Sequence, residues 1–179
     1  MFALVLLVVA ALLVFWVIGV YNRLICARNH FKTAFSPVDA CLKQRYELIP
    51  SLVEVAKGYM KHERETLEAV ITARNQAVAA IARVSADPSK ASAVQQLAAA
   101  EVALIAALAK MYALSQSYPD LRTNPHMMQL SEELSNTESK IVFSRQAYND
   151  SVIQYNISIE QMPGSVIARM FFFRAGALL

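Results

Sequence analysis

The sequence predicts an all-α protein, in which a single N-terminal transmembrane helix runs into an antiparallel bundle of about four long helices. Three observations predict this fold. The first residues form a long uncharged stretch, only four glycines and six prolines interrupt the 179 residues, and apolar side chains recur at helical intervals through most of the rest. We therefore divide the chain into a transmembrane anchor (1–21), a helical bundle (22–161) and an apolar C-terminal tail (162–179).

The anchor is the segment Phe2–Tyr21, which contains no charged residue. As a helix it would span about 30 Å, the thickness of the hydrocarbon core of a bilayer. A cleaved signal peptide is the alternative, but no Lys or Arg precedes the apolar run. Trp16 and Tyr21 occupy positions typical of interfacial aromatic residues, and Arg23 and Arg28 follow them. The positive-inside rule then predicts one membrane crossing, with a short N-terminus outside and the bundle in the cytoplasm.

The first long helix is predicted from the apolar pattern that runs from the anchor to Gly58 without a change of phase. Pro37 and Pro50 fall inside this pattern, and each removes a backbone hydrogen bond. Ser36-Pro37 can begin a new helix or kink a continuous one; the unbroken phase favours a kink at both prolines. Gly58, which follows Lys57, predicts the end of the helix and a bend near residues 58–62. We expect Gly58→Val to damage the protein more than Pro50→Ala.

Two shorter helices are predicted next. Apolar residues from Leu67 to Val84 form the first, which Asp87-Pro88 ends while offering a cap for the second. Apolar residues from Val94 to Leu114 form the second, which is rich in alanine and can therefore approach a neighbour closely. Together they predict a helical hairpin.

The last helix has the most regular apolar pattern in the chain. It is predicted from His126 to Gln161, with Asn124 as its N-cap and Pro163-Gly164 as its stop. Its length matches that of the segment Asn22–Gly58, at roughly 55 Å for each. We expect these two long helices to lie side by side, with the last one returning towards the membrane.

The tail that follows is apolar and contains Arg169 and Arg174 but no acidic residue. Phe171, Phe172 and Phe173 are adjacent in it, and three adjacent phenylalanines suit an interface better than water. If the last helix returns to the membrane, the tail can lie among the lipid headgroups. The alternative is that it packs onto the bundle or onto a neighbouring subunit.

The sequence contains no motif that indicates catalysis, a metal or a cofactor. His62-Glu63-Arg64-Glu65 begins like a zinc-protease motif, but Thr66 stands where the second His is needed. Although His62 and Glu63 are the least poor catalytic candidates, we expect a protein that is not an enzyme. The net charge of +3 is too small to indicate nucleic acid. Cys26 and Cys41 are too far apart on one helix to form a disulfide and are expected to be free thiols.

Several short segments spread over nearly the whole chain resemble the LemA family. They are Tyr21-Asn22-Arg23-Leu24, Leu42-Lys43-Gln44-Arg45-Tyr46-Glu47-Leu48-Ile49-Pro50, Lys57-Gly58-Tyr59, His62-Glu63-Arg64-Glu65-Thr66-Leu67, Tyr118-Pro119-Asp120-Leu121, Tyr148-Asn149-Asp150 and Tyr155-Asn156. The resemblance implies a bacterial inner-membrane protein with a short external N-terminus and a cytoplasmic helical bundle. It implies no agreed biochemical activity.

The leading functional hypothesis is a membrane-anchored structural or scaffolding protein that forms homo-oligomers. Its partners are then the lipid bilayer and further copies of the chain. A second hypothesis is a membrane-shaping protein, in which the anchor and the tail together insert into one leaflet of the bilayer and curve it. A third is an adaptor or regulator of a membrane enzyme such as a protease, with a membrane protein as its partner.

Overall fold

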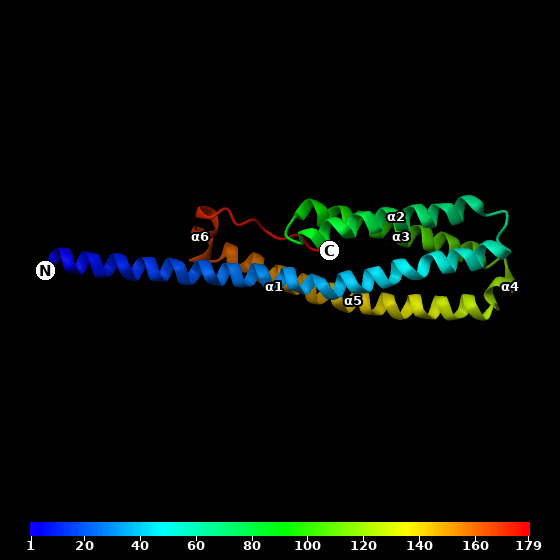
Figure 1. Ribbon diagram of the computed structural model, residues 1–179, viewed down its shortest axis with the longest axis horizontal. Coiled ribbons are helices and arrows are strands. Elements are labelled where there is room, and N and C mark those ends of the chain that lie inside the picture. Colours follow the sequence, from blue (N-terminus) through cyan, green and yellow to red (C-terminus); the bar gives the residue numbers. More distant parts are fainter.

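The computed structural model describes residues 1–179 and contains six helices and no strand, which confirms the all-α prediction. Figure 1 shows an elongated molecule in which the N-terminal part of the first helix projects from one end of a bundle. The helices are α1 (Phe2–Tyr59), α2 (Arg64–Ala86), α3 (Ala91–Ser115), α4 (Pro119–Arg122), α5 (Pro125–Glu160) and α6 (Gly164–Met170).

The first helix, α1, is continuous from the apolar N-terminal segment into the bundle. Its most apolar 18-residue window has a mean hydropathy of 3.1, and none of that window is buried in the protein. This segment suggests a membrane anchor or a signal sequence. A window in α3 also reaches a mean hydropathy of 1.8, but α3 packs against α2 within the bundle.

Both interior prolines lie within the unbroken helix α1, as the phase of the apolar pattern predicts. Pro37 and Pro50 are exposed, so their rings face away from the packed side of the helix. Because Pro50 has no N–H, the carbonyl oxygen of Tyr46 loses its helical partner. Arg74 of α2 replaces that partner, since its Nε donates to the Tyr46 carbonyl oxygen at 3.0 Å.

The predicted end of the first helix near Gly58 and the bend after it are confirmed, since α1 ends at Tyr59 and a turn follows at residues 60–63. Two details of the helix ends are wrong. No glycine has a positive φ, and α1 runs through Gly58. Gly58 is therefore an ordinary helical residue inside the last turn. Asp87-Pro88 ends α2, but Asp87 does not cap α3, because it accepts instead from the backbone N–H and hydroxyl of Ser89 within the turn. The predicted cap of α5 is confirmed, since the Asn124 side chain accepts from two backbone N–H groups.

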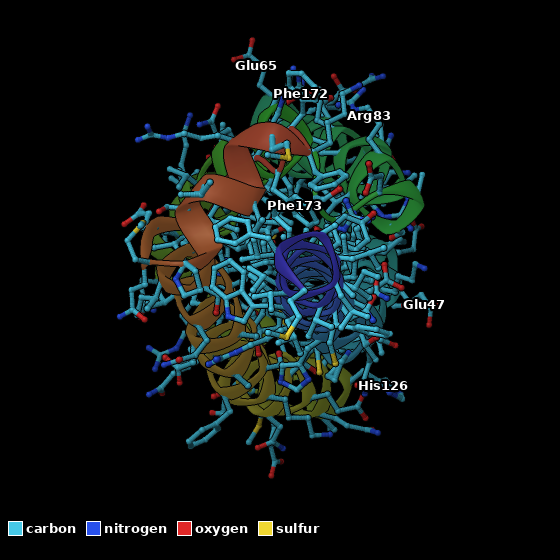
Figure 2. The ribbon with its side chains drawn as sticks, turned by 90° about the vertical axis from the view of Figure 1, so that its left-hand side faces the viewer. Glu47, Glu65, Arg83, His126, Phe172 and Phe173 are labelled. Atoms are coloured by element: carbon cyan, nitrogen blue, oxygen red, sulfur yellow. The ribbon has the colours of Figure 1, made fainter.

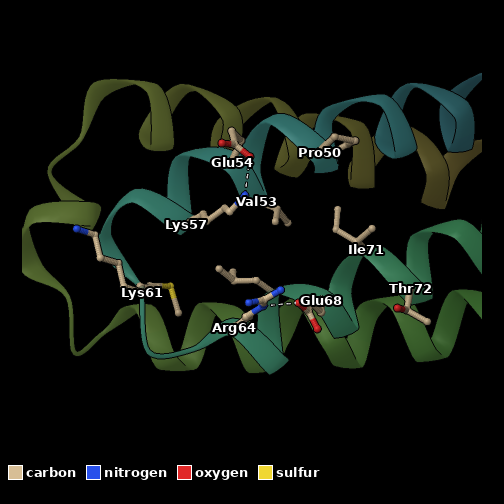
Figure 3. A pocket seen from close by; sticks show the side chains of 11 residues that line it. Pro50, Val53, Glu54, Lys57, Lys61, Arg64, Glu68, Ile71 and Thr72 are labelled. Carbon is tan, nitrogen blue, oxygen red and sulfur yellow. Dashed lines mark hydrogen bonds and ion pairs between the residues drawn. The ribbon is translucent and has the colours of Figure 1, made fainter.

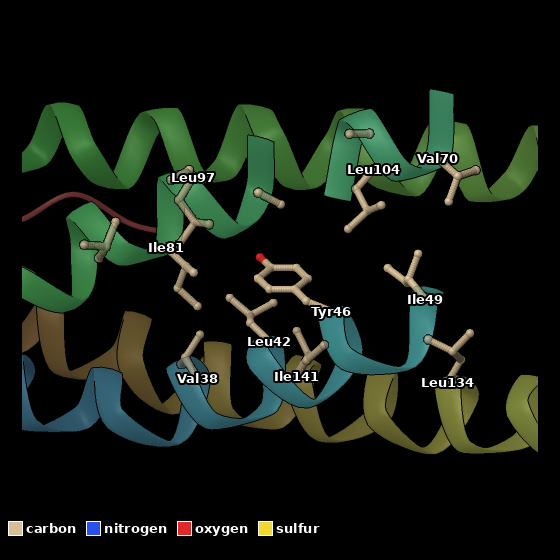
Figure 4. Packing of buried hydrophobic residues seen from close by; sticks show 14 of the residues in the cluster. Val38, Leu42, Tyr46, Ile49, Val70, Ile81, Leu97, Leu104, Leu134 and Ile141 are labelled. Carbon is tan, nitrogen blue, oxygen red and sulfur yellow. The ribbon is translucent and has the colours of Figure 1, made fainter. Parts of the chain in front are cut away.

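The four long helices form an antiparallel bundle in which α5 returns alongside α1 (Figure 1), as predicted. The hairpin of α2 and α3 covers another side of α1, through contacts between α2 and α1. The core lies between these layers (Figure 4) and includes Leu42, Ile49, Ile81, Leu97 and Ile141. The helices α3 and α5 do not pack closely against each other, so the ring of four helices stays open on that side.

The hairpin is shorter than the pair of outer helices, and its turn lies level with Lys32, whose amino group is 3.0 Å from a carboxylate oxygen of Asp87. Nearer the N-terminal end, α1 is covered by α5 and by the C-terminal tail (Figure 1). Here the ring of Phe31 packs at a tilt against that of Tyr155, with ring centroids 4.9 Å apart, and the rings of Phe35 and Tyr148 meet edge to face at 5.6 Å. The core therefore continues beyond the hairpin.

Candidate functional site

The last helix, α6, lies beside the part of α1 where the uncharged segment ends (Figure 1). Ile167 and Ala168 are buried against Leu24 in a small cluster, around which Val17, Val20 and Tyr21 pack. The turn from α5 into α6 requires glycine, because a Cβ at Gly164 would collide with the carbonyl oxygen of Ser158. This turn sets α6 at the level where α1 would leave a bilayer.

Aromatic side chains join the tail to α1 at this level. The ring of Tyr21 lies 4.8 Å from that of Phe171 and 5.7 Å from that of Phe173, and the guanidinium of Arg28 lies 5.2 Å from the centre of the Phe173 ring. Figure 2 looks along α1 from its N-terminal end and shows Phe173 close to that helix. Contacts between Arg28 and an aromatic face are favourable for the cation.

The outer surface of this region is apolar and basic. We call its exposed apolar residues the juxtamembrane patch: Met162, Val166, Met170, Phe171 and Phe172. Phe172 is the most exposed of them, at 87%. Arg169 and Arg174 are exposed in the same stretch, and residues 161–179 contain no acidic side chain. Such a mixture of apolar and basic residues is typical of segments that lie in a lipid headgroup region.

The structure brings together four of the seven residues that the sequence assigns to the membrane interface, namely Tyr21, Arg28, Phe171 and Phe173. Arg23 lines a small hollow beside Pro163. Trp16 is exposed on the uncovered part of α1, and Phe172 extends away from the other aromatic rings into the surroundings.

The rest of the tail, Arg174–Leu179, has no regular secondary structure and runs back along the bundle (Figure 1); we call it the tail strand although it pairs with no β-strand. Side chains of α5 hold its main chain, and we call these side chains the tail seat: Tyr148, Asn149, Tyr155 and Asn156. The two tyrosine hydroxyls donate to the carbonyl oxygens of Ala177 at 3.2 Å and Arg174 at 2.9 Å. Burial raises the pKa of Tyr148 to about 12, which keeps its hydroxyl protonated as a donor.

Each asparagine of the tail seat bonds both polar groups of one tail residue. Asn156 donates to the carbonyl oxygen of Gly176 at 3.0 Å and accepts from its N–H at 2.8 Å. Asn149 does the same with Leu179, at 3.0 and 2.9 Å. A side-chain amide that donates and accepts in this way stands in for a neighbouring β-strand.

The spacing of the tail seat matches that of an extended chain. The two Tyr-Asn pairs are seven residues apart on α5, a rise of about 10.5 Å. Their partners Gly176 and Leu179 are three residues apart in the tail strand, which is about 10 Å in extended backbone. The seat also limits side-chain size, because a Cβ at Gly176 would lie 3.0 Å from Val152 Cγ1.

The open side of the bundle between α3 and α5 forms a second surface, which we call the seam. Its cavity of about 530 Å³ is lined by Arg45, Ile105, Leu108, Ala109, Tyr112, Ser131, Leu134, Ser135 and Glu138. Next to it, Val102 and Ile105 are 68% and 44% exposed on α3, and Val142 is 56% exposed on α5. The seam therefore combines a polar floor with apolar edges.

The floor of the seam is a buried ionic cluster. Arg45, which is 2% exposed, donates through Nη1 to Glu138 at 2.8 Å and through Nη2 to Glu101. Tyr46 donates its hydroxyl to the other oxygen of Glu101, which is 1% exposed. The pKa of Tyr46 is raised mainly by burial and further by the negative charge of Glu101. Since Glu138 is half exposed, only Arg45 and Glu101 form a fully buried charge pair.

A larger groove lies between α1 and α2 at the end of the bundle far from the N-terminus (Figure 3). Its volume is about 970 Å³, and it is lined by Pro50, Val53, Glu54, Lys57, Met60, Lys61, Arg64, Leu67, Glu68, Ile71 and Thr72. Four of its charged residues pair along the chain, Arg64 with Glu68 at 2.7 Å and Lys57 with Glu54 at 3.8 Å.

His62 is exposed in the turn before α2, where it lines a hollow together with Glu63, Glu65, Glu68 and Lys110, and the side chain of Glu63 does not cap that helix. No three His, Cys, Asp or Glu side chains lie close enough to hold a metal ion. Cys26 is exposed and Cys41 is partly buried, and both are free thiols.

The LemA family model matches residues 34–179, which include most of the bundle, the tail seat and the tail strand. The chain belongs to the LemA family. A search of curated protein sequences gave no significant match. In this LemA protein, several of the segments on which the resemblance rests fall at Pro50, in the buried cluster, in the turn before α2 and in the tail seat, while Tyr21–Leu24 lies beside α6 and Tyr118–Leu121 forms most of α4.

Sequence reasoning missed the roles of the buried cluster and the tail seat of this LemA protein. Arg45 stands between Leu42 and Ile49 on the apolar face of α1, and Glu101 stands between Leu97 and Leu104 on that of α3. A charged residue at such a position was the available signal. For the tail seat, the signal was the repeat of a Tyr-Asn pair after seven residues.

Proposed function

We propose that this LemA protein is a non-enzymatic scaffold that is anchored in the bacterial inner membrane by α1 and self-assembles through the sides of its bundle. The bundle lies in the cytoplasm and the short N-terminus outside. The observation that carries this proposal is a group of exposed apolar residues on the outer side of α5, which no part of the chain covers.

That group, the outer stripe of α5, consists of Met128, Val142, Phe143, Ile153 and Ile157, of which Phe143 is 73% exposed. Val142, Ile153 and Ile157 follow at intervals of eleven and four residues, three turns and one turn of an α-helix. The packed face of α5 uses other positions, among them Leu134, Ile141 and Tyr148. Exposed apolar residues that gather on one side of a helix are typical of a surface that binds a partner.

A second copy of the chain suits this surface. The outer stripe runs next to the seam, whose exposed edges Val102 and Ile105 belong to α3. A neighbouring α5 seated on the seam would cover apolar residues of both helices. Each copy would offer its outer stripe to one neighbour and its seam to another, so the contact can repeat from copy to copy. Anchoring all copies in one membrane raises their local concentration.

The test compares the particle mass of the full chain in mild detergent with that of Val142→Ser/Ile153→Ser, both on the outer stripe. We expect oligomers for the natural sequence and a shift to monomers for the double variant. The control is Val166→Ser, which removes a similar exposed side chain from α6. A natural sequence that is strictly monomeric at membrane-like protein density contradicts the proposal.

Membrane shaping is a second candidate function, which the juxtamembrane patch favours. Its apolar residues surround α6 beside the end of the α1 anchor, so that both would load the same leaflet. Vesicles reconstituted with the natural sequence should be more curved than those with Phe171→Ser/Phe172→Ser. Substitution is preferable to truncation, because the tail strand completes the core. Equal vesicle sizes would argue against this function.

A further inference from the structure

The tail seat recognises the tail strand through its main chain. All six hydrogen bonds between them use backbone N–H or C=O groups of the tail strand. The residues at the centre of the strand, Ala175, Gly176 and Ala177, are the three smallest in it. Such a seat accepts any copy of the same segment, whichever chain supplies it.

The connection to the tail strand contains a strained residue. Phe172 has φ 57° and is the only non-glycine residue with a positive φ. A bulky side chain is disfavoured in this left-handed region. Because Phe172 is 87% exposed, packing of its side chain does not hold it there. The left-handed turn is what sends the tail strand back onto its own bundle instead of away from it.

We propose that the segment Phe173–Leu179 exchanges between copies, so that the tail strand of one chain occupies the tail seat of its neighbour. A short strained hinge, followed by a segment that a self-contained seat recognises, is the arrangement that favours domain swapping. Exchange relieves the strain at Phe172 while reforming every hydrogen bond of the seat. This inference rests on the proposed self-assembly, because it requires neighbouring copies. It links the C-terminal end of one copy to α5 of the next.

The test uses two co-expressed full-length chains with different tags, in which Cys26 and Cys41 are replaced by Ser. One chain carries Asn149→Cys and the other Leu179→Cys, because the side chain of Asn149 bonds the main chain of Leu179. A short bismaleimide is added in native membranes. A cross-link between the two tags reports exchange, and a single chain that carries both cysteines reports the closed form.

Two matched variants of the hinge sharpen the test. Phe172→Asn tolerates a positive φ, whereas Phe172→Thr is β-branched and does not, although both remove the aromatic ring and are polar. We expect the ratio of inter-chain to intra-chain product to be about five- to tenfold higher for Thr than for Asn. Equal ratios, or intra-chain product alone in every variant, overturn the proposal.

Particle mass measured on the same samples separates this inference from the proposed function. Oligomers that contain no inter-chain product overturn exchange and leave self-assembly standing. Strict monomers overturn both. Both are supported by oligomers in which the amount of inter-chain product is highest with Thr at position 172, intermediate with Phe and lowest with Asn.

Discussion

The buried cluster of Arg45, Tyr46 and Glu101 permits a quantitative test of the fold. Arg45→Met removes the only cation that faces Glu101, and leaves that carboxylate with the hydroxyl of Tyr46 as its one donor. Since Glu101 is 1% exposed, water cannot replace the lost partner without disturbing the core. We therefore expect a large loss of stability from this single substitution.

Breaking one side of a buried ion pair costs about 3–5 kcal/mol, whereas replacing all its members by apolar residues of similar volume is often neutral or stabilising. Arg45→Met alone should accordingly lower the melting temperature by roughly 6–20 °C for a chain of this size. The triple variant Arg45→Met/Tyr46→Phe/Glu101→Leu removes every buried polar group of the trio and should be as stable as the natural sequence or more stable, by up to about 4 kcal/mol.

The measurement is thermal and urea unfolding of the full chain in detergent, followed by circular dichroism. Lys43→Met is the matched control, because its side chain is 53% exposed and pairs with Asp39 at the surface. Exposed pairs contribute less than about 1 kcal/mol. If the triple variant is as unstable as Arg45→Met, the loss comes from packing and the argument from an unpaired buried charge is refuted.

Four further predictions concern local structure. Gly58→Ala should raise the free energy of unfolding by about 0.5–1 kcal/mol, because the residue is helical and a Cβ there meets open space; a loss in the melting curve would restore the reading of Gly58 as a required helix end. Arg74→Met should lower the free energy of unfolding by about 1 kcal/mol. In a Pro50→Ala background the loss should be much smaller, because the N–H of residue 50 then bonds the Tyr46 carbonyl oxygen. Equal losses in the two backgrounds of this double-mutant cycle would contradict the coupling. The hydrogen bond from Ser89, followed by that from Lys32, lowers the pKa of Asp87 to about 2. The contribution of this carboxylate to the free energy of unfolding is therefore present above the ordinary carboxyl pKa and is lost as the pH falls towards 2. It should be at most about 1 kcal/mol because the carboxylate is half exposed, and Asp87→Asn should remove it from the pH dependence of unfolding. Gly176→Val should displace the tail strand from Val152, seen as faster amide exchange at residues 174–179, whereas Ala175→Val, at an exposed neighbour, should leave that exchange unchanged.

The arrangement of the long helices followed from the sequence because one physical rule dominates it. Apolar residues at helical intervals from Leu24 to Ala56 all became buried, and they kept one face of α1 across both prolines. The matched apolar face of α5 then required α1 as its partner. Periodicity, length and the absence of breakers were sufficient for these elements.

The candidate sites could not be predicted as readily, because their chemistry lies in contacts between distant residues. Arg45 and Glu101 interrupt apolar faces, but each reads as a surface charge until the other is placed beside it. The tail strand has no periodic pattern, and its partners Asn149 and Asn156 look like solvated positions on a helix. Gly58 and Asp87 were assigned by residue type, whereas the actual ends of the helices depend on the turns that follow them.

The proposed self-assembly is tested most directly by the mass of single particles of the full chain, extracted from native membranes into lipid nanodiscs. We expect particles that contain several copies, and a loss of those particles in Val142→Ser/Ile153→Ser but not in Val166→Ser. A single copy per particle over the whole range of protein density would contradict it.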